Sequence, residues 1–509
     1  MEEKIIRTQI FDNKTVLSET SEQPIDVDFT LPEYYPDINK ILKCCCVARI
    51  SSKGVNGRTV TGEGTATVTV IYIDRENMLN SYEYQYPFSK SFDAPDLSGG
   101  ACLCITAKTD YINCRAVTAR KVDIHGAVSI SATVTEKEPF ELVSDVELDD
   151  VEVLRRTVSA NMPLSCSEKN ISLDETVEIG AGAKDINCLI RYDGSVTLKE
   201  SKLIAGKVMV KGELALSLLY CNEEGEIASL RENLPFSQMI ETEASGDNCG
   251  IDTDAVLSSL EIKPKSDSEG KTRSFSVDAG ILVSVSTYCT GDTEIVIDAY
   301  SRKYETAVEK KETVFTSVSD TVNDEFGVKQ TLSFDSGISA VVDMWCAVKS
   351  GITGIEEGVL SSEGTLLVSI IANGEDSVPV FYEREIPFTY KRELSEKGED
   401  THTEPKITVR NCSFTLLGSE SMEVRAELGI NAAVYECRRQ SAVTDISVDY
   451  EKPAARPDDC AMTVYFASVG ESVWEIASRY LADIEEIKEI NDISEDILSI
   501  DKMILVPIS

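Results

Sequence analysis

Three stretches of this chain decide its fold: GTATVTVIYI at residues 64–73, GELALSLLYC at 212–221 and GTLLVSIIAN at 364–373. Each is a glycine followed by nine residues in which apolar positions recur at every second place. An alternation of period two is typical of a β-strand with one face toward a core. The side chains expected on that face are Ala66, Val68, Val70 and Tyr72, then Leu214, Leu216, Leu218 and Tyr220, then Leu366, Val368, Ile370 and Ala372.

A Pro-Phe pair follows each stretch at a constant distance. Pro87, Pro235 and Pro387 each come 23 residues after the first glycine, and each precedes a phenylalanine. A glycine suits a positive φ or a close approach of the backbone, and a Pro-Phe pair suits a strand edge with an aromatic anchor in the core. The first glycines are 148 and then 152 residues apart, so the sequence contains three copies of one unit. A second strand-like segment in these copies carries Gly126, Gly280 and Gly429.

These copies predict a mainly β protein with three tandem, antiparallel, sandwich-like repeats. Helical turns are expected as embellishments at PDINKILK from Pro36 and at AVLSSL from Ala255. The segment EKPAARPDDC after Tyr450 has two prolines and is typical of a short, stiff linker. The predicted domains are 1–140, 141–303 and 304–450 for the repeats, 451–459 for the linker and 460–509 for a small C-terminal module.

The C-terminal module has the order strand, helix, helix, strand, with the strand-like segments TVYF and MILVP enclosing the helices. Ser472 can cap the first helix, and Glu475 three residues later can return the bond as in a capping box. The second helix is expected to begin at Asp483 and to end at Asn491. A βααβ module of this size depends on one small core. The inward side chains expected on the second helix are Ile484, Ile487 and Ile490.

The repeat unit resembles the SPOCS domain of clostridial spore-coat and envelope proteins, in which several copies often precede a C-terminal LysM domain. The resemblance covers most of residues 1–450 and rests on the order of the repeats more than on any one motif. It implies a role in assembling the spore coat around the developing forespore. It also implies contact with the morphogenetic ATPase that forms the base of the coat.

The C-terminal module resembles LysM domains. GESVW at 470–474 is similar to the family's GDTLW, IASRY at 476–480 to its IAxxY, and Asn491 to its helix-ending asparagine. The resemblance implies a shallow groove for an N-acetylglucosamine glycan, between the loop entering the first helix and the loop before the last strand. The binding residues implied are Gly470, Glu471, Ser472 and Val473 on one side, with Ile497, Leu498, Ser499 and Ile500 on the other.

Two ligand classes stay open for this groove, and a purely structural cap is the third reading. Backbone amides in tight loops can hold acetamido groups, and apolar side chains can cover sugar faces. The ten acids and three bases of residues 460–509 give the module a net charge of −7, which suits a protein partner equally well. Asp501 and Lys502 stand where the family usually has a P-G-Q turn. Trp474, in the first turn of the helix, is expected to be a buried anchor.

Composition limits the partners and the compartment. The 49 Lys and Arg against 88 Asp and Glu give a net charge of −39, which repels phosphate backbones and anionic lipid and argues against nucleic acid. No apolar run approaches the roughly 20 residues of a membrane span, and the N-terminus lacks the apolar segment of a secretory signal. We therefore expect a cytoplasmic protein, and the resemblance to SPOCS and LysM proteins implies the mother-cell cytoplasm with assembly at the forespore surface.

Cysteines and histidines give no pattern for metal or catalysis. The odd count of 15 cysteines predicts reduced thiols, mostly small core residues; oxidative cross-linking between chains is the alternative, at the run Cys44, Cys45 and Cys46. Without CxxC, and with only His125 and His402, neither a zinc site nor a Ser/His or Cys/His relay is predicted. No GxGxxG or GxxxxGK[ST] fingerprint is present, so no cofactor is expected.

The expected function is that of a non-catalytic scaffold for spore coat and envelope assembly. In this hypothesis the repeats make protein contacts, and the LysM module anchors the chain to a coat morphogenetic protein, such as the ATPase, or to a glycan. The alternative is a general cell-wall adaptor that binds peptidoglycan in growing cells. The scaffold is favoured because peptidoglycan lies outside the compartment in which the chain is expected to remain.

Overall fold

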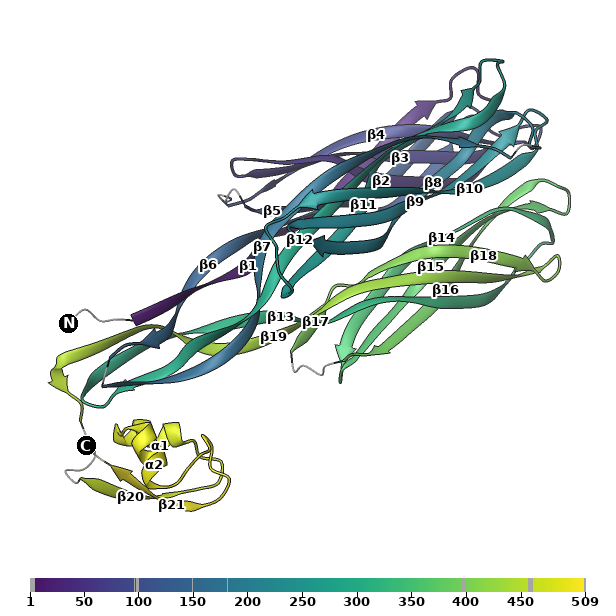
Figure 1. Cartoon of the computed structure of the whole chain (residues 1–509). Helices are drawn as coiled ribbons and strands as arrows, with labels where there is room; N and C mark the ends of the chain where they lie inside the picture. Colours follow the sequence, from purple (N-terminus) through teal and green to yellow (C-terminus); the bar gives the residue numbers. More distant parts are fainter. Residues whose placement is uncertain are drawn as a thin grey trace.

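A computed structural model gives the arrangement of the chain, which is almost entirely antiparallel strands apart from two helices near the C-terminus (Figure 1). This confirms the predicted mainly β class with a small βααβ domain at the end. None of the helices in the described part of the chain is long and apolar enough to cross a membrane. The structure describes residues 5–95, 97, 100–148, 150–180, 182–395, 400–455 and 461–507.

The first repeat is a sandwich of two three-stranded antiparallel sheets, with strand orders β1-β6-β5 and β2-β3-β4. Apolar side chains from both sheets form one core between them, in which Val68 and Ile130 are fully buried. Its strands are β1 (Ile5–Thr30), β2 (Lys40–Asn56), β3 (Thr59–Ile73), β4 (Leu79–Asp93), β5 (Cys102–Ala116) and β6 (Lys121–Val146).

The second and third repeats have the same strand order, with a core of their own between the sheets. In the third repeat the edge strand is split in two. The second repeat contains β7 (Val151–Glu178), β8 (Ile186–Ile204), β9 (Lys207–Asn222), β10 (Ile227–Glu241), β11 (Cys249–Ser266) and β12 (Thr272–Ser301). The third contains β13 (Tyr304–Ser333), β14 (Ile338–Glu356), β15 (Val359–Gly374), β16 (Pro379–Glu393), β17 (Thr401–Thr403), β18 (Lys406–Leu416) and β19 (Ser421–Pro453).

The exact limits of the predicted domains stay predictions. Strand β6 runs without a break through residue 140, while β12 ends at Ser301 and β13 begins at Tyr304. Part of the predicted linker, residues 456–459, lies outside the described residues, and β19 extends to Pro453.

The constant interval between each first glycine and its Pro-Phe pair is explained by one cross-strand contact. Gly64 on β3 pairs directly with Phe88 on β4, and the same pairs recur in the other repeats. A Cβ atom on any of these glycines would lie within 2.6 Å of the phenylalanine ring. The ring therefore covers the bare backbone of the glycine, an arrangement that pins strand register. The equivalent pairs are Gly212 with Phe236 and Gly364 with Phe388.

Both predicted helical turns are wrong, because each lies in or beside a strand with a bulge. Residues 255–260 belong to β11, where the register shifts between Leu257 and Ser259. The bulge places Ala255 and Ser258, three residues apart, toward the inside, which imitates helical spacing. In PDINKILK the strand β2 starts at Lys40 and shifts register before Lys43.

The three repeats pack around a common axis. Ile71, Leu219 and Ile371 occupy the same position in the three repeats, and all three are buried in one shared cluster. At the opposite end the paired long strands β1/β6, β7/β12 and β13/β19 extend beyond the sandwiches and pack together, with Val143 and its equivalents in one core (Figure 1). The chain thus resembles a closed trimer of repeats.

Polar contacts join the first repeat to the second, the second to the third and the third to the first. Glu83, Arg231 and Glu383 are equivalent residues, and each reaches the next repeat in turn. Tyr192 of the second repeat donates to Glu83 of the first over 2.8 Å, and Arg231 of the second donates to the carbonyl of Cys412 in the third over 3.2 Å. Glu383 of the third repeat then pairs with Lys43 of the first.

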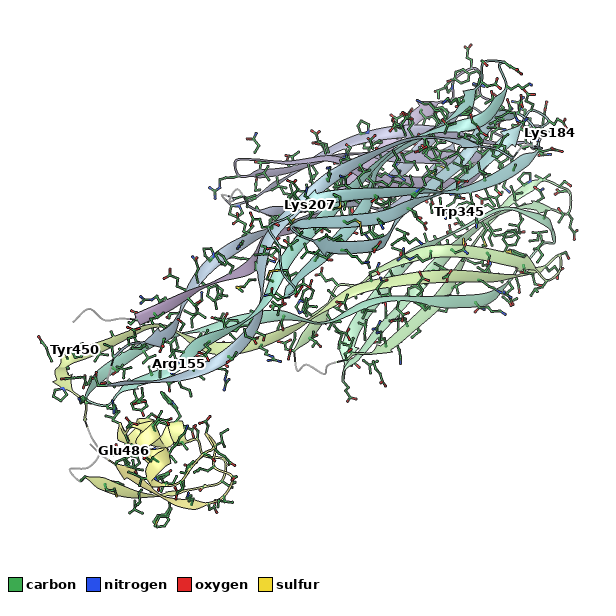
Figure 2. The ribbon with its side chains drawn as sticks, viewed as in Figure 1. Arg155, Lys184, Lys207, Trp345, Tyr450 and Glu486 are labelled. Carbon is green, nitrogen blue, oxygen red and sulfur yellow. A yellow bond between two sulfur atoms is a disulfide. The ribbon has the colours of Figure 1, made fainter. Side chains whose placement is uncertain are left out.

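A buried ion pair lies beside the shared apolar cluster. Arg191 donates to the carboxylate of Asp343 over 3.0 Å, and both side chains are less than 10% exposed. The Arg191 guanidinium also lies 4.2 Å from the ring centre of Trp345, which sits between the second and third sandwiches (Figure 2). This pair joins the second repeat to the third.

Candidate functional site

The C-terminal module forms as predicted, and its elements explain the motif residues that carry the resemblance. Ser472 and Glu475 make both bonds of the capping box at α1. Asn491 ends α2 and exchanges two hydrogen bonds with the backbone of Leu505, at 2.7 and 2.8 Å, which ties the helix to the last strand. The elements are β20 (Met462–Ala467), α1 (Val473–Tyr480), α2 (Ile484–Ile490) and β21 (Lys502–Pro507).

One inward assignment in this module is wrong. Ile487 is fully buried and Ile484 packs against the core, but Ile490 is 39% exposed. The reason is the shortness of α2, which has only seven residues and leaves its last side chain beyond the small core.

The structure brings the two predicted binding loops together. Gly470, with φ of +90°, donates to the carbonyl of Leu498 over 2.8 Å, and Leu498 donates to the carbonyl of Glu471 over 2.9 Å. Ser472 and Ile497 form an isolated bridge, and Val473 donates to the carbonyl of Asp496. These amides already have acceptors inside the protein, so holding an acetamido group would require them to give those acceptors up.

The predicted side chains divide into core and surface. The side chains of Val473 and Leu498 are buried in the core of the module. Ile497 and Ile500 are 60% and 65% exposed, and Ser499 is also exposed. The predicted binding side chains that remain accessible on the second loop are therefore Ile497, Ser499 and Ile500, two of them apolar.

Two carboxylates, of Glu471 and Asp501, fix the conformation of these loops through hydrogen bonds. Glu471 accepts hydrogen bonds from the backbone of Ser468 at 2.7 Å and from the Tyr465 hydroxyl at 2.8 Å, which hold the pKa of its carboxyl below the ordinary value. Asp501 accepts from the backbone of Val469 over 2.8 Å. Asp501 thus performs, by a side-chain bond, the loop closure for which the family usually has a tight turn.

Sequence reasoning missed the outer face of the small sheet. Phe466 on β20 pairs with Met503 on β21, and their side chains are 76% and 55% exposed. Val464 and Met462 follow on the same face, since side chains alternate along a strand. The signal was present in the sequence, because in MTVYF every second residue is apolar on the side away from the core. We call these four residues, Met462, Val464, Phe466 and Met503, the apolar face of the module; Val469, Ile497 and Ile500 in the loops are exposed as well.

The module is docked onto the end of the second repeat. The Trp474 indole donates to Asp298 on β12 over 3.0 Å, and its ring lies 5.1 Å from that of Tyr300. The Tyr300 hydroxyl donates to the carbonyl of Ala482 over 2.6 Å, and Arg302 pairs with Asp483 at 2.6 Å. Trp474 is only 7% exposed, so it serves as a buried anchor.

The expectation of reduced thiols is wrong for four cysteines, which the structure joins in two disulfides. Cys249 and Cys289 are direct partners on neighbouring strands. Cys102 and Cys166 lie on β5 and β7, so their bond connects the first repeat to the second. These cysteines are 64 and 40 residues apart in the sequence and come together only in the folded chain, so their spacing did not indicate the two disulfides. The run at residues 44–46 stays free. Burial raises the pKa values of the Cys45 and Cys46 thiols, and a hydrogen bond with Cys114 together with burial raises that of Cys44.

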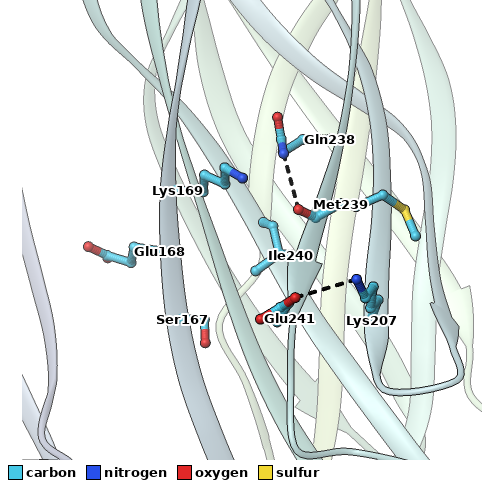
Figure 3. A pocket seen from close by; sticks show the side chains of 8 residues that line it. All are labelled: Ser167, Glu168, Lys169, Lys207, Gln238, Met239, Ile240 and Glu241. Atoms are coloured by element: carbon cyan, nitrogen blue, oxygen red, sulfur yellow. Dashed lines mark hydrogen bonds and ion pairs between the residues drawn. The ribbon is translucent and has the colours of Figure 1, made fainter.

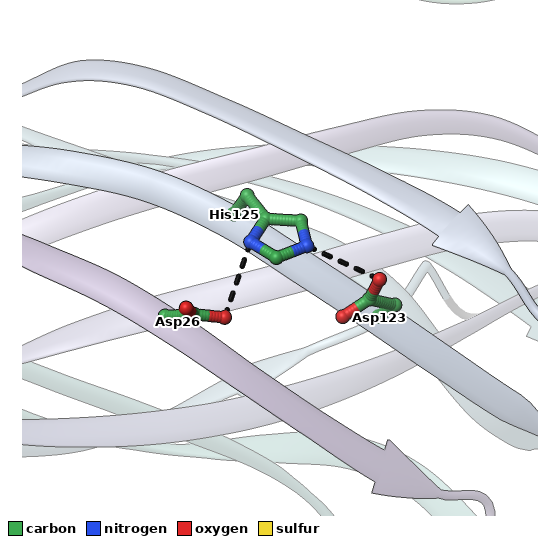
Figure 4. Close-up of side chains that lie close together, drawn as sticks. All are labelled: Asp26, Asp123 and His125. Carbon is green, nitrogen blue, oxygen red and sulfur yellow. Dashed lines mark hydrogen bonds and ion pairs between the residues drawn. The ribbon is translucent and has the colours of Figure 1, made fainter.

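One polar cluster surrounds His125. Its Nδ1 and Nε2 atoms each lie 3.1 Å from a carboxylate oxygen, of Asp26 and Asp123 respectively (Figure 4). The two nitrogens point in different directions, so the carboxylates bracket the imidazole instead of converging with it on one point. The arrangement is that of an exposed histidine held between two carboxylates.

A cavity of about 540 Å³ opens in the second repeat between β7, β9 and β10 (Figure 3). Three of its charged groups are paired: Lys207 lies 3.4 Å from Glu241, and Glu168 lies 2.5 Å from Lys53 of the first repeat.

Comparison with protein families agrees with this architecture. The model of the SPOCS domain, described as SipL, SPOCS domain, matches residues 37–117 and 185–265, over β2–β5 and β8–β11. The LysM domain matches residues 469–507. No curated protein and no solved structure matched the chain.

Fold and matches together define the class: this is a tandem β-repeat protein with a C-terminal recognition module, assembled from non-catalytic binding domains. More particularly, the chain carries SPOCS domains followed by a LysM domain, as predicted. The third repeat has the strand order of the two that the family model matches. These domains connect the protein with sporulation and with glycan binding.

Proposed function

We propose that the protein is a non-catalytic scaffold for spore coat and envelope assembly, and that its LysM module anchors it to a coat morphogenetic protein, such as the coat ATPase. In this proposal the chain acts in the mother-cell cytoplasm and assembles at the forespore surface. The fused ring of repeats serves as a rigid body that presents the module.

The apolar face of the LysM module is the observation that carries this proposal. Its four side chains are large, apolar and exposed, from 47% for Met462 to 76% for Phe466. Exposed apolar side chains gathered on one side of a domain mark an interaction site, and surrounding charge selects the partner. With a module charge of −7, the expected partner surface is apolar with basic residues at its edge.

Glycan binding is the second candidate, and the family match supports it. Ile497 and Ile500 could cover a sugar face. Protein docking ranks first because the amides of Gly470, Val473 and Leu498 are engaged within the protein, and because the apolar face lies on β20 and β21, outside those loops.

The test is localisation of fluorescent fusions in sporulating and growing cells of the source organism. Four chains are compared: wild type, a chain ending before residue 460, Phe466→Glu, and Ile352→Glu as the matched control. Ile352 is also highly exposed, at 82%, but lies on β14 of the third repeat.

A ring around the forespore that is lost in the truncated chain and in Phe466→Glu, but kept in Ile352→Glu, is the expected result. A uniform signal at the wall of growing cells, together with pelleting of the purified chain by peptidoglycan, would overturn the scaffold and establish the glycan adaptor.

A further inference from the structure

We propose that Cys437 and His402 form an activated thiol pair, a covalent modification site whose substrate class is disulfides. The Sγ atom of Cys437 lies 3.4 Å from Nδ1 of His402. The two residues are 35 positions apart in the sequence, and the fold brings them together on β19 and β17 of the third repeat. This site is independent of what the LysM module binds.

Strand pairing fixes the geometry of the pair. His402 is the direct partner of Tyr435, and Cys437 stands two residues further along β19 on the same face. Diagonal neighbours of this kind are within reach of a long or aromatic side chain. The imidazole stacks on the Tyr435 ring, with centroids 5.2 Å apart and planes at 21°, which holds Nδ1 toward the sulfur. Thr316 on β13 contacts the sulfur from the other side at 3.8 Å.

The surroundings of the pair are polar and accessible. His402 is exposed and Cys437 is half-buried. Glu436 pairs with Arg438, and Arg439 lies 3.7 Å from Asp400, whose carbonyl accepts the Cys437 amide. Further titratable groups near the Tyr435 ring are Asp252 and Tyr288 of the second repeat and Glu404.

Other free thiols of the described chain have different neighbours. The hydrogen bond with Cys114 and burial raise the pKa of Cys44, and burial raises the pKa values of Cys45 and Cys46. The pKa values of Cys114, Cys221 and Cys412 are lowered, but each of these thiols bonds another cysteine and not an imidazole. Cys104 is the exposed free cysteine, yet its thiol pKa is also raised by burial of the sulfur. A thiolate, not a thiol, is the nucleophile, and an adjacent base creates it.

The reaction is thiol–disulfide exchange. The Cys437 proton passes to Nδ1 of His402, and the sulfur attacks one sulfur of a disulfide RS–SR′. The new Cys437–SR bond forms as the RS–SR′ bond breaks, and R′S⁻ leaves and takes up the proton. One disulfide is consumed and one is formed, so the exchange needs no further oxidant. The product is a chain covalently attached to R, which would lock an assembled partner in place.

The experiment exposes the full-length protein to glutathione disulfide at pH 7 and follows each cysteine by peptide-resolved mass spectrometry. Cys437 is expected to be modified about tenfold faster than Cys104, although it is less exposed. His402→Gln should slow Cys437 about tenfold and leave Cys104 unchanged, while His125→Gln should change neither. Circular dichroism and thermal unfolding check that the variants are folded.

A pH series on the wild-type protein gives a readout that needs no variant. Imidazoles change charge between pH 5 and 8, so the ratio of the Cys437 rate to the Cys104 rate should change over that interval. Equal rates at the two cysteines, or a Cys437 rate that does not respond to His402→Gln, would overturn the proposal.

Discussion

The indole nitrogen of Trp474 lies 3.0 Å from a carboxylate oxygen of Asp298, and this hydrogen bond joins the LysM module to the second repeat. The two residues are 176 positions apart. Asp298 also pairs with Lys310 of the third repeat, so one carboxylate connects the module with both the second and the third repeat. The recognition module is thereby held in one orientation.

Trp474→Phe should release the module while leaving the repeats folded. The substitution keeps an aromatic ring next to Tyr300 but removes the donor to a charged acceptor, a bond worth about 1.5–3 kcal/mol. Small-angle scattering should show a longer maximum dimension, and limited proteolysis should cut faster between the repeats and the module. Asp298→Asn should act in the same direction, and Asp278→Asn, an exposed site on the same strand, should have no effect. Unchanged scattering in Trp474→Phe would mean that other contacts fix the module.

Gly364→Ala should destabilise the third repeat by about 1–3 kcal/mol, because overpacking forces a rearrangement. A Cβ atom there would lie 2.4 Å from both the Phe388 ring and the carbonyl of Ser350. The matched control is Gly354→Ala on β14, where a Cβ atom meets nothing within 4 Å. Thermal unfolding of both variants measures the difference, and equal midpoints would show that the glycine is not needed for the close contact.

Removing one partner of the buried Arg191–Asp343 pair should cost about 3–5 kcal/mol, because the other charge is left buried without its partner. Arg191→Met is therefore expected to be strongly destabilising in urea unfolding, and Arg191→Met with Asp343→Leu much less so. Glu138→Gln at the exposed Lys14–Glu138 pair serves as the control and should change stability by less than about 1 kcal/mol. A double variant as unstable as the single one would contradict this account.

Glu471→Gln should make the LysM loops insensitive to acid. Hydrogen bonds from Ser468 and Tyr465 lower the pKa of Glu471 in the folded chain, so its stabilisation is complete above the ordinary value of 4.5. That stabilisation is lost as the pH falls through the lowered folded value. Wild type should therefore be more stable than Glu471→Gln at pH 7, and the two should converge in strong acid. Thermal unfolding against pH measures this, with Glu495→Gln at an exposed site as control.

Local pattern was enough to predict the repeats and the module, because both depend on contacts between near neighbours in sequence. Alternation in the stretches from Gly64, Gly212 and Gly364 gave the central strands, and the fixed interval to the phenylalanine reflected a hairpin contact within one sheet. The caps at Ser472 and Asp483 lie within a few residues of the groups they bond. Where a bulge interrupted the alternation, as at Ser258, the same reasoning mistook a strand for a helical turn.

Only the tertiary structure showed how the three repeats pack against one another. The sequence by itself determined that this protein has three β repeats and a LysM module, since each is specified by period, turn and cap. It did not determine that Ile71, Leu219 and Ile371 meet in one cluster, that Cys102 reaches Cys166, or that His402 lies beside Cys437. These contacts join residues far apart in the chain, and they depend on the twist of strands and the closure of the ring, which no local pattern of residues encodes.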